Sequence, residues 1–294
     1  MPEERRATVI EYLAAIGFSG YDTKAKAEEL TSEVMVDPTH KYISKLKNND
    51  IIVEYIKELE GNIGLLVRGK LVDDTELVVQ TLMPYVNPKY SMPIVEAEVE
   101  NINEFLDYYV CCEEEITGSQ VDFCLHNVVE YLDVESDNST CVDSLSVVGL
   151  SLDGKIILNV EQDDGLLQEE EWHQEILRKA RLGNDEAKDL LQEQSDEMEE
   201  VIEERMQSED IFTILEGFFM PFGEDEGMYS VLGTIKEVEK IENSITKEIL
   251  YKLHLDSIGI ELEVCIGEKD LVGIPSIGMR FVGVCWLQGR LIFS

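Results

Sequence analysis

The sequence predicts an α+β protein in which two related antiparallel β modules are separated by an acidic helical segment. Three observations lead to this expectation: alternating apolar residues in the stretch 228–293, a similar pattern about 140 residues upstream, and helical spacing of apolar residues elsewhere. They divide the 294 residues into four parts. These are an N-terminal, mainly helical region (1–60), a first β module (61–162), an acidic helical hairpin (163–209) and a second β module (210–294).

The N-terminal region carries two helical patterns. Residues 8–16 place apolar side chains at helical spacing and end at Gly17, which suits the left-handed conformation of a helix C-cap. Thr23 precedes a second pattern, and Pro38 stops it because proline interrupts the helical hydrogen bonding. We therefore expect two short helices here.

The next residues lead into the first β module. The stretch 40–49 holds the densest cluster of lysines in the chain and is interpreted as a solvated helix face. Residues 51–59 fit either a helix or a strand. Strands at 64–68 and 77–82 are expected to open the module.

The second β module has the clearest pattern. Residues 249–256 and 260–266 both alternate, which predicts a hairpin with one dry face. On this pattern Lys252, His254 and Asp256 fall on the opposite face of the first strand, and Glu261 and Glu263 are expected to point outward from the second.

The last strand of this module is apolar on nearly both faces. Residues 278–287 are therefore predicted to form a central strand that is covered on each side. Gln288 and Gly289 follow between two apolar runs, at the spacing of a tight hairpin turn.

The first module repeats this order of features in a weaker form. Order and strand phase are both kept, and a slip of one residue would invert every side chain. We therefore predict an internal duplication and expect the two modules to pack on each other about a local twofold axis. The matched residues include Glu98 with Glu237, Val110 with Tyr251, Phe123 with Val264, and Gly149 with Gly283.

The segment between the modules has a different composition. Residues 166–209 are rich in Glu, Gln, Leu and Ala, and their apolar residues recur at helical spacing. Gly183-Asn184-Asp185 interrupts the run, and Asp185 is suited to cap a second helix. This segment is therefore expected to be a pair of packed helices rather than an acidic linker.

The net charge of −38 narrows the choice of partners. Such a surface repels phosphate backbones and anionic membranes, so neither direct nucleic-acid binding nor a membrane partner is expected. Residues 91–154 contain no Lys or Arg at all. An acidic face of this kind is either simply solvated or a docking face for a basic protein partner. No Asp-rich calcium loop is present in the sequence.

Cysteine usage and the apolar runs indicate a cytoplasmic protein. The six cysteines include no CxxC pair and fit small buried residues in a reducing compartment. Neither a signal peptide nor an apolar run long enough for a membrane span is predicted.

No residue set amounts to a catalytic site. The four histidines are scattered, and His126 and His254 fall on predicted outward faces. No motif predicts a metal site or a cofactor. Arg280 is the one candidate binding residue, because it stands alone in an apolar strand. It is expected either to snorkel or pair with an acid, or to anchor an anionic ligand, while Trp286 beside it is expected in the core.

Several short segments carry a resemblance to a known family. They are Ala14-Ala15-Ile16-Gly17-Phe18-Ser19, Phe219-Met220-Pro221-Phe222-Gly223, Tyr229-Ser230-Val231-Leu232-Gly233, Gly278-Met279-Arg280-Phe281 and Trp286-Leu287-Gln288-Gly289. The chain resembles a family of uncharacterised proteins from clostridia and related Firmicutes, a domain of unknown function. The resemblance implies a cytoplasmic bacterial protein and carries no activity, cofactor or site.

Three classes of function remain open. The favoured one is a non-enzymatic interaction or adaptor protein that presents an acidic surface to a protein partner. The alternatives are a hydrolase-type enzyme that uses a carboxylate pair between the modules, and a sensor that binds a small ligand near Arg280.

Overall fold

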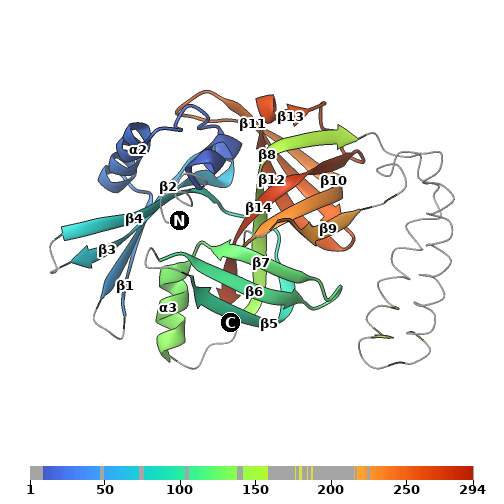
Figure 1. The fold of residues 1–294 in the computed structure, drawn as a ribbon, viewed down its shortest axis with the longest axis horizontal. Coiled ribbons are helices and arrows are strands. Elements are labelled where there is room, and N and C mark those ends of the chain that lie inside the picture. The colour runs from blue at the N-terminus through green and yellow to red at the C-terminus, as the bar shows by residue number, and fades with distance from the viewer. Residues whose placement is uncertain are drawn as a thin grey trace.

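The structure is a computed structural model that describes residues 9–46, 50–72, 76–102, 106–137, 142–157, 176, 179–180, 184, 187, 215, 217–223 and 226–293. Strands predominate and form two hydrogen-bonded sheets, with a few short helices around them (Figure 1). The predicted α+β class is confirmed at this level.

The two N-terminal helices lie where they are predicted. A 3₁₀ helix, η1 (Tyr12–Ile16), ends at Gly17, whose φ of 85° is left-handed. Helix α2 (Lys24–Val36) begins after Thr23 and ends before Pro38. Both bury their apolar side against the strands that follow.

The first sheet has four antiparallel strands in chain order: β1 (His40–Lys45), β2 (Ile51–Glu58), β3 (Ile63–Val72) and β4 (Glu76–Val86). A short 3₁₀ turn, η2 (Glu60–Asn62), joins β2 to β3.

This sheet corrects the prediction of a helix face in the lysine-rich stretch 40–49, because His40–Lys45 form strand β1. For residues 51–59 helix and strand were both open, and Ile51–Glu58 form strand β2. The β-branched residues of β2 favour extended backbone and pair with β3 along its whole length. Because β3 and β4 pair within this sheet, they do not join the strands of the first predicted module.

The second sheet begins with three antiparallel strands, one helix and a long strand. These are β5 (Met92–Asn101), β6 (Tyr108–Glu114), β7 (Gln120–Leu125), α3 (Val128–Asp137) and β8 (Val142–Ile157). In Figure 1 the green strands β5, β6 and β7 lie together, with α3 beside them.

The C-terminal part adds a second set of strands. They are β9 (Phe218–Pro221), β10 (Met228–Glu242), β11 (Ile249–Ser257), β12 (Ile260–Gly267), β13 (Leu271–Val272) and β14 (Arg280–Phe293), with the turn η3 (Glu268–Asp270) before β13. The predicted hairpin over 249–266 is confirmed, and Gly259 in its turn has a φ of 86°.

The long strands β8 and β14 join the two sets of strands. They pair with each other in antiparallel fashion, from Arg280 opposite Ile157 to Phe293 opposite Val142. Strand β8 also pairs with β5 and β12, and β14 also pairs with β10 and β7. The strands therefore close into two rings that share β8 and β14, so the two sets lie edge to edge in one sheet rather than packing face to face.

The prediction of a hairpin turn at Gln288-Gly289 is wrong, because β14 runs through both residues. Gly289 is needed for another reason: atoms of neighbouring strands lie too close to its Cα to leave room for a side chain. A Cβ at Gly289 would lie 2.5 Å from the Ser146 carbonyl oxygen and 2.9 Å from the Phe123 ring. Trp286 is 4% exposed, as expected of a core residue.

Four side chains that the alternation placed outward are buried. Lys252, His254, Glu263 and His126 are only 3%, 8%, 2% and 2% exposed. Residues of the first sheet and of the segment after it cover the first three, since Lys252 Nζ donates to the Gly61 carbonyl at 3.0 Å and the Tyr90 ring stacks on His254.

The predicted acidic helical hairpin lies almost entirely outside the described residues. Of its residues that are described, Ile176, Ala180 and Ala187 are helical and form a small buried cluster. Asn184 Oδ1 accepts a hydrogen bond from the Ala187 amide at 3.0 Å, and the predicted cap Asp185 lies outside the described residues.

Candidate functional site

The outer face of β5, β6 and β7 is strongly acidic. Glu98 lies opposite Cys111, and Cys111 lies opposite Asp122, so the three side chains form one row across the strands. Glu96 and Glu100 flank this row on β5. We call these residues together with Glu113 the acidic face. All are exposed except Asp122, which is half-buried.

Strand alternation alone places these side chains outward. Their chain neighbours Val110, Val121 and Phe123 point into the ring and are fully buried. Because residues 91–154 contain no Lys or Arg, no base from the same strands neutralises the acidic face. Cys111 in its centre is exposed, while the described cysteines elsewhere are buried. Burial and the nearby Asp122 carboxylate raise the pKa of the Cys111 thiol.

The corresponding row on the second set of strands is Glu237, His254 and Glu263. Here the segment after β4 covers it: the Lys89 amide donates to Glu263 Oε2 at 2.7 Å, and the Tyr90 ring lies parallel to His254 with 3.6 Å between ring centroids. The Tyr90 hydroxyl also hydrogen-bonds Glu237, and burial with this bond raises the pKa of Tyr90. We call Lys89-Tyr90 the covering segment.

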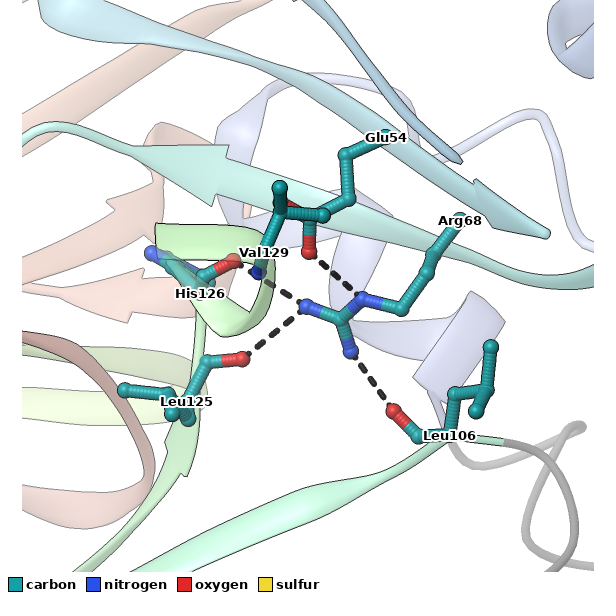
Figure 2. A network of polar contacts seen from close by, with 6 residues as sticks. All are labelled: Glu54, Arg68, Leu106, Leu125, His126 and Val129. Atoms are coloured by element: carbon teal, nitrogen blue, oxygen red, sulfur yellow. Dashed lines mark hydrogen bonds and ion pairs between the residues drawn. The ribbon is translucent and has the colours of Figure 1, made fainter. Parts of the chain in front are cut away.

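A buried arginine joins the first sheet to the β5–β7 set. Arg68 is inaccessible to solvent; its Nε donates to Glu54 Oε1 at 2.7 Å, and its other nitrogens donate to the carbonyls of Leu106, Leu125 and His126 at 2.8–3.1 Å. Figure 2 shows the guanidinium enclosed by these acceptors.

Glu54 completes this network at the start of α3. Its second oxygen accepts from the Val129 amide at 3.4 Å, where the positive end of the helix dipole favours a carboxylate. Burial raises the pKa of Glu54, and the Arg68 guanidinium partly offsets that effect. The network leaves few donors of Arg68 for a ligand, so its role is to hold the sheets together.

A pocket of about 360 Å³ lies beside this network, between the first sheet and α3. We call it the α3 pocket. Its walls include Tyr42 from β1, Tyr85 from β4, His126 before α3, Glu130 and Asp133 on α3, and Arg290 from β14.

The polar groups of the α3 pocket differ in their partners. His126 Nε2 lies 2.8 Å from Gln288 Oε1, and Arg290 Nη2 lies 3.3 Å from Glu130 Oε2. Ser44 Oγ donates to Asp133 Oδ1 at 2.6 Å. Burial lowers the pKa of His126 to about 4 and raises the pKa of Tyr85 to about 12, so both side chains are neutral at pH 7.

The structure places Arg280 away from this pocket, at the start of β14. It is 4% exposed, and its Nη1 donates to the Leu215 carbonyl at 2.6 Å. A backbone carbonyl is therefore the acceptor for this nitrogen.

Sequence reasoning missed Arg68 and misplaced His126. Arg68 follows Gly64-Leu65-Leu66-Val67, so the signal that singled out Arg280, a lone arginine in an apolar strand, was present there too. His126 was assigned outward by alternation, but it stands just beyond the end of β7, where α3 and β4 enclose it.

The described residues provide neither a metal site nor a membrane-spanning helix. No group of three or more His, Cys, Asp or Glu side chains within them is arranged to hold a metal ion. None of the helices described here is both long and apolar enough to cross a membrane.

A family model described as a domain of unknown function, E. rectale gene description (DUF3881), matches residues 13–289. Neither the curated proteins nor the solved structures contain a match.

Proposed function

The chain belongs to the family DUF3881, a domain of unknown function, and we propose that it is a non-enzymatic interaction protein whose acidic face docks a basic protein partner. The observation that carries this proposal is the contrast between the two outer rows. The row Glu237–His254–Glu263 is covered by Lys89-Tyr90, whereas in the matching row Glu98 and Cys111 are exposed and Asp122 is half-buried.

The covered row indicates the chemistry of the partner. In that row an extended segment supplies a backbone amide to one acid, an aromatic ring to the central side chain and a tyrosine hydroxyl to the other acid. Lys89 Nζ adds an ion pair with Glu239 at 3.4 Å. We therefore expect the partner to present an extended segment with a lysine or arginine next to an aromatic residue.

Electrostatics favour such a partner in a further way. A surface with a net charge of −38 attracts a basic protein over distances set by ionic screening, which falls off within about 10 Å at 0.1 M salt. The same charge disfavours direct binding to nucleic acids and to anionic membranes.

The first experiment is a nuclease-treated pull-down from the source cells with three baits. They are the wild type, the face variant E96Q/E98Q/E100Q, and the matched control E28Q/E29Q/E33Q, which removes three exposed charges on α2 instead. A basic partner should bind the wild type and the control and be lost from the face variant.

Cys111 reports whether the partner covers the acidic face. It is exposed, whereas the other described cysteines, Cys112, Cys124, Cys265 and Cys285, are buried and shielded from the reagent. In a Cys141→Ser background, the purified partner should slow maleimide labelling of Cys111. A partner that binds all three baits equally, or leaves labelling unchanged, contradicts the proposal.

We also propose that the two sets of strands arose by internal duplication. Their strand registers support this. Cys124 pairs with Gln288 across β7 and β14, and Cys265 pairs with Leu150 across β12 and β8. Met92 pairs with Leu145 in the first set, and Val231 with Gly283 in the second.

These pairings revise the residue matches suggested by the sequence. Glu98 still corresponds to Glu237 and Phe123 to Val264, but Val110 corresponds to Leu253 rather than Tyr251. Likewise Gly149 corresponds to Leu287 rather than Gly283. Each shift is an even number of residues, so the inward and outward faces stay the same.

A further inference from the structure

Two side chains of the α3 pocket place a polar atom on the pocket rather than in the closed core. Tyr85 is 8% exposed and His126 is 2% exposed, and both line the pocket. Neither the Tyr85 hydroxyl nor His126 Nδ1 is among the described buried atoms that lack a partner, so both open onto the pocket, where a bound molecule can reach them. With Gln288 Oε1 as the acceptor for His126 Nε2–H, Nδ1 is left as an acceptor.

The two groups have complementary requirements. Tyr85 keeps its proton at pH 7 and can donate a hydrogen bond, whereas neutral His126 can only accept one at Nδ1. Their rings are adjacent, with 5.3 Å between centroids. A primary amide satisfies both at once, since it offers a carbonyl oxygen and an N–H₂ group side by side.

The rim of the pocket carries opposite charges next to each other. Arg290 uses one nitrogen on Glu130, and both side chains are about one-third to one-half exposed. Asp133 lies one helical turn after Glu130 on α3. A plain anion would meet two carboxylates here and a plain cation would meet a guanidinium, so the rim suits a zwitterion.

We propose that the α3 pocket binds a free α-amino acid with a primary amide side chain, such as glutamine or asparagine. Its carboxylate contacts Arg290, its ammonium contacts Glu130 and Asp133, and its amide lies between Tyr85 and His126. A volume of about 360 Å³ is at the small end of ligand pockets, which excludes a dinucleotide or another large cofactor. This site is independent of the acidic face.

The test is isothermal titration calorimetry on the full-length protein with L-glutamine, L-asparagine, L-glutamate and L-norleucine. We expect glutamine or asparagine to bind at least tenfold more tightly than glutamate or norleucine. Glutamate lacks the donor for His126 Nδ1, and norleucine leaves both buried groups unpaired. N-acetylglutamine, which has no ammonium group, should lose binding as well.

Two variants and one control complete the test. Tyr85→Phe removes only a hydroxyl, and Arg290→Gln removes only the rim cation; each should weaken binding at least tenfold. Glu242→Gln, which breaks the exposed Lys247–Glu242 ion pair elsewhere, should leave binding unchanged. Melting curves without ligand verify that each variant is folded.

Three results would overturn the proposal. The first is the absence of binding by either amide amino acid, and the second is equal binding of glutamate. The third is full binding by folded Tyr85→Phe and Arg290→Gln proteins.

Discussion

The two sets of strands, β5–β7 and β10–β12, have the same pairing order but treat their outer charges differently. On β10–β12, the acids Glu239 and Glu263 pair with Lys252, and the covering segment lies over His254. On β5–β7, the acidic face has no base from its own strands; in its central row Glu98 and Cys111 are exposed, and Asp122 is half-buried beside Tyr229.

The difference shows when a protein can bury acids. Glu263 is 2% exposed because a lysine and a backbone amide replace the water that its carboxylate loses. The acids around Cys111 have no base on their own strands, and Glu96, Glu98 and Glu100 stay in solvent. The same strand pattern thus gives an outer face that is covered by other parts of the chain on β10–β12, and a largely exposed outer face on β5–β7.

One buried cation also connects each of the two sets of strands to the first sheet. Arg68 reaches from β3 to the carbonyls around β7, and Lys252 reaches from β11 to Gly61 between β2 and β3.

The largest effect is expected from Arg68→Met. It removes the ion pair of the buried Glu54 carboxylate, and we expect a loss of about 3–5 kcal/mol in the free energy of unfolding. Urea denaturation measures it. The double variant Arg68→Met/Glu54→Leu should recover part of the loss, because no buried charge is left unpaired; no recovery would contradict the explanation.

The next effect is a dependence of stability on pH through His126. Its pKa is lowered to about 4 in the folded protein, so the unfolded chain binds the proton first as the pH falls. The contribution of neutral His126 to the free energy of unfolding is therefore complete above pH 6.5. As the pH falls from 6.5 to 4 this contribution is lost, and the loss amounts to at most about 3 kcal/mol.

A His126→Gln variant isolates this contribution. Urea denaturation of the two proteins from pH 7.5 to 4 should give a difference that shrinks as the pH falls, since the variant lacks the titrating ring. A constant difference over that range would show that His126 is not the group responsible.

A smaller loss is expected from Lys252→Met. Its neighbour Glu239 is 41% exposed and can return to water, whereas Glu263 keeps the Lys89 amide as a donor. We expect a loss of roughly 2 kcal/mol, below that of Arg68→Met, again by urea denaturation. A loss equal to or larger than that of Arg68→Met would contradict the prediction that the Arg68 contacts stabilise the fold more than the Lys252 contacts.

The smallest effect should follow from the face variant E96Q/E98Q/E100Q. Removing like charges from neighbouring positions should raise stability by less than about 1 kcal/mol at low salt, and the gain should vanish at high salt. The control E28Q/E29Q/E33Q should change less, because α2 also carries Lys24 and Lys26. A salt-independent change would show that packing, not repulsion, is involved.

Much of the local structure was determined by the sequence alone. Alternation predicted the hairpin of β11 and β12, and the helical spacing before Gly17 and after Thr23 predicted η1 and the start of α2. The acidic outer face of β5–β7 follows from the same alternation and from the absence of bases in residues 91–154.

Only the tertiary structure decided what covers each face. Alternation states which side chains share a side of a strand, but Lys252, His254 and Glu263 are buried by Gly61, Lys89 and Tyr90, more than 150 positions away. The same holds for Gly289, which is needed by Ser146 and Phe123 rather than by a turn, and for the α3 pocket, which β1, β4, α3 and β14 form together. Burial is a property of the assembled sheets, so no local pattern encodes it.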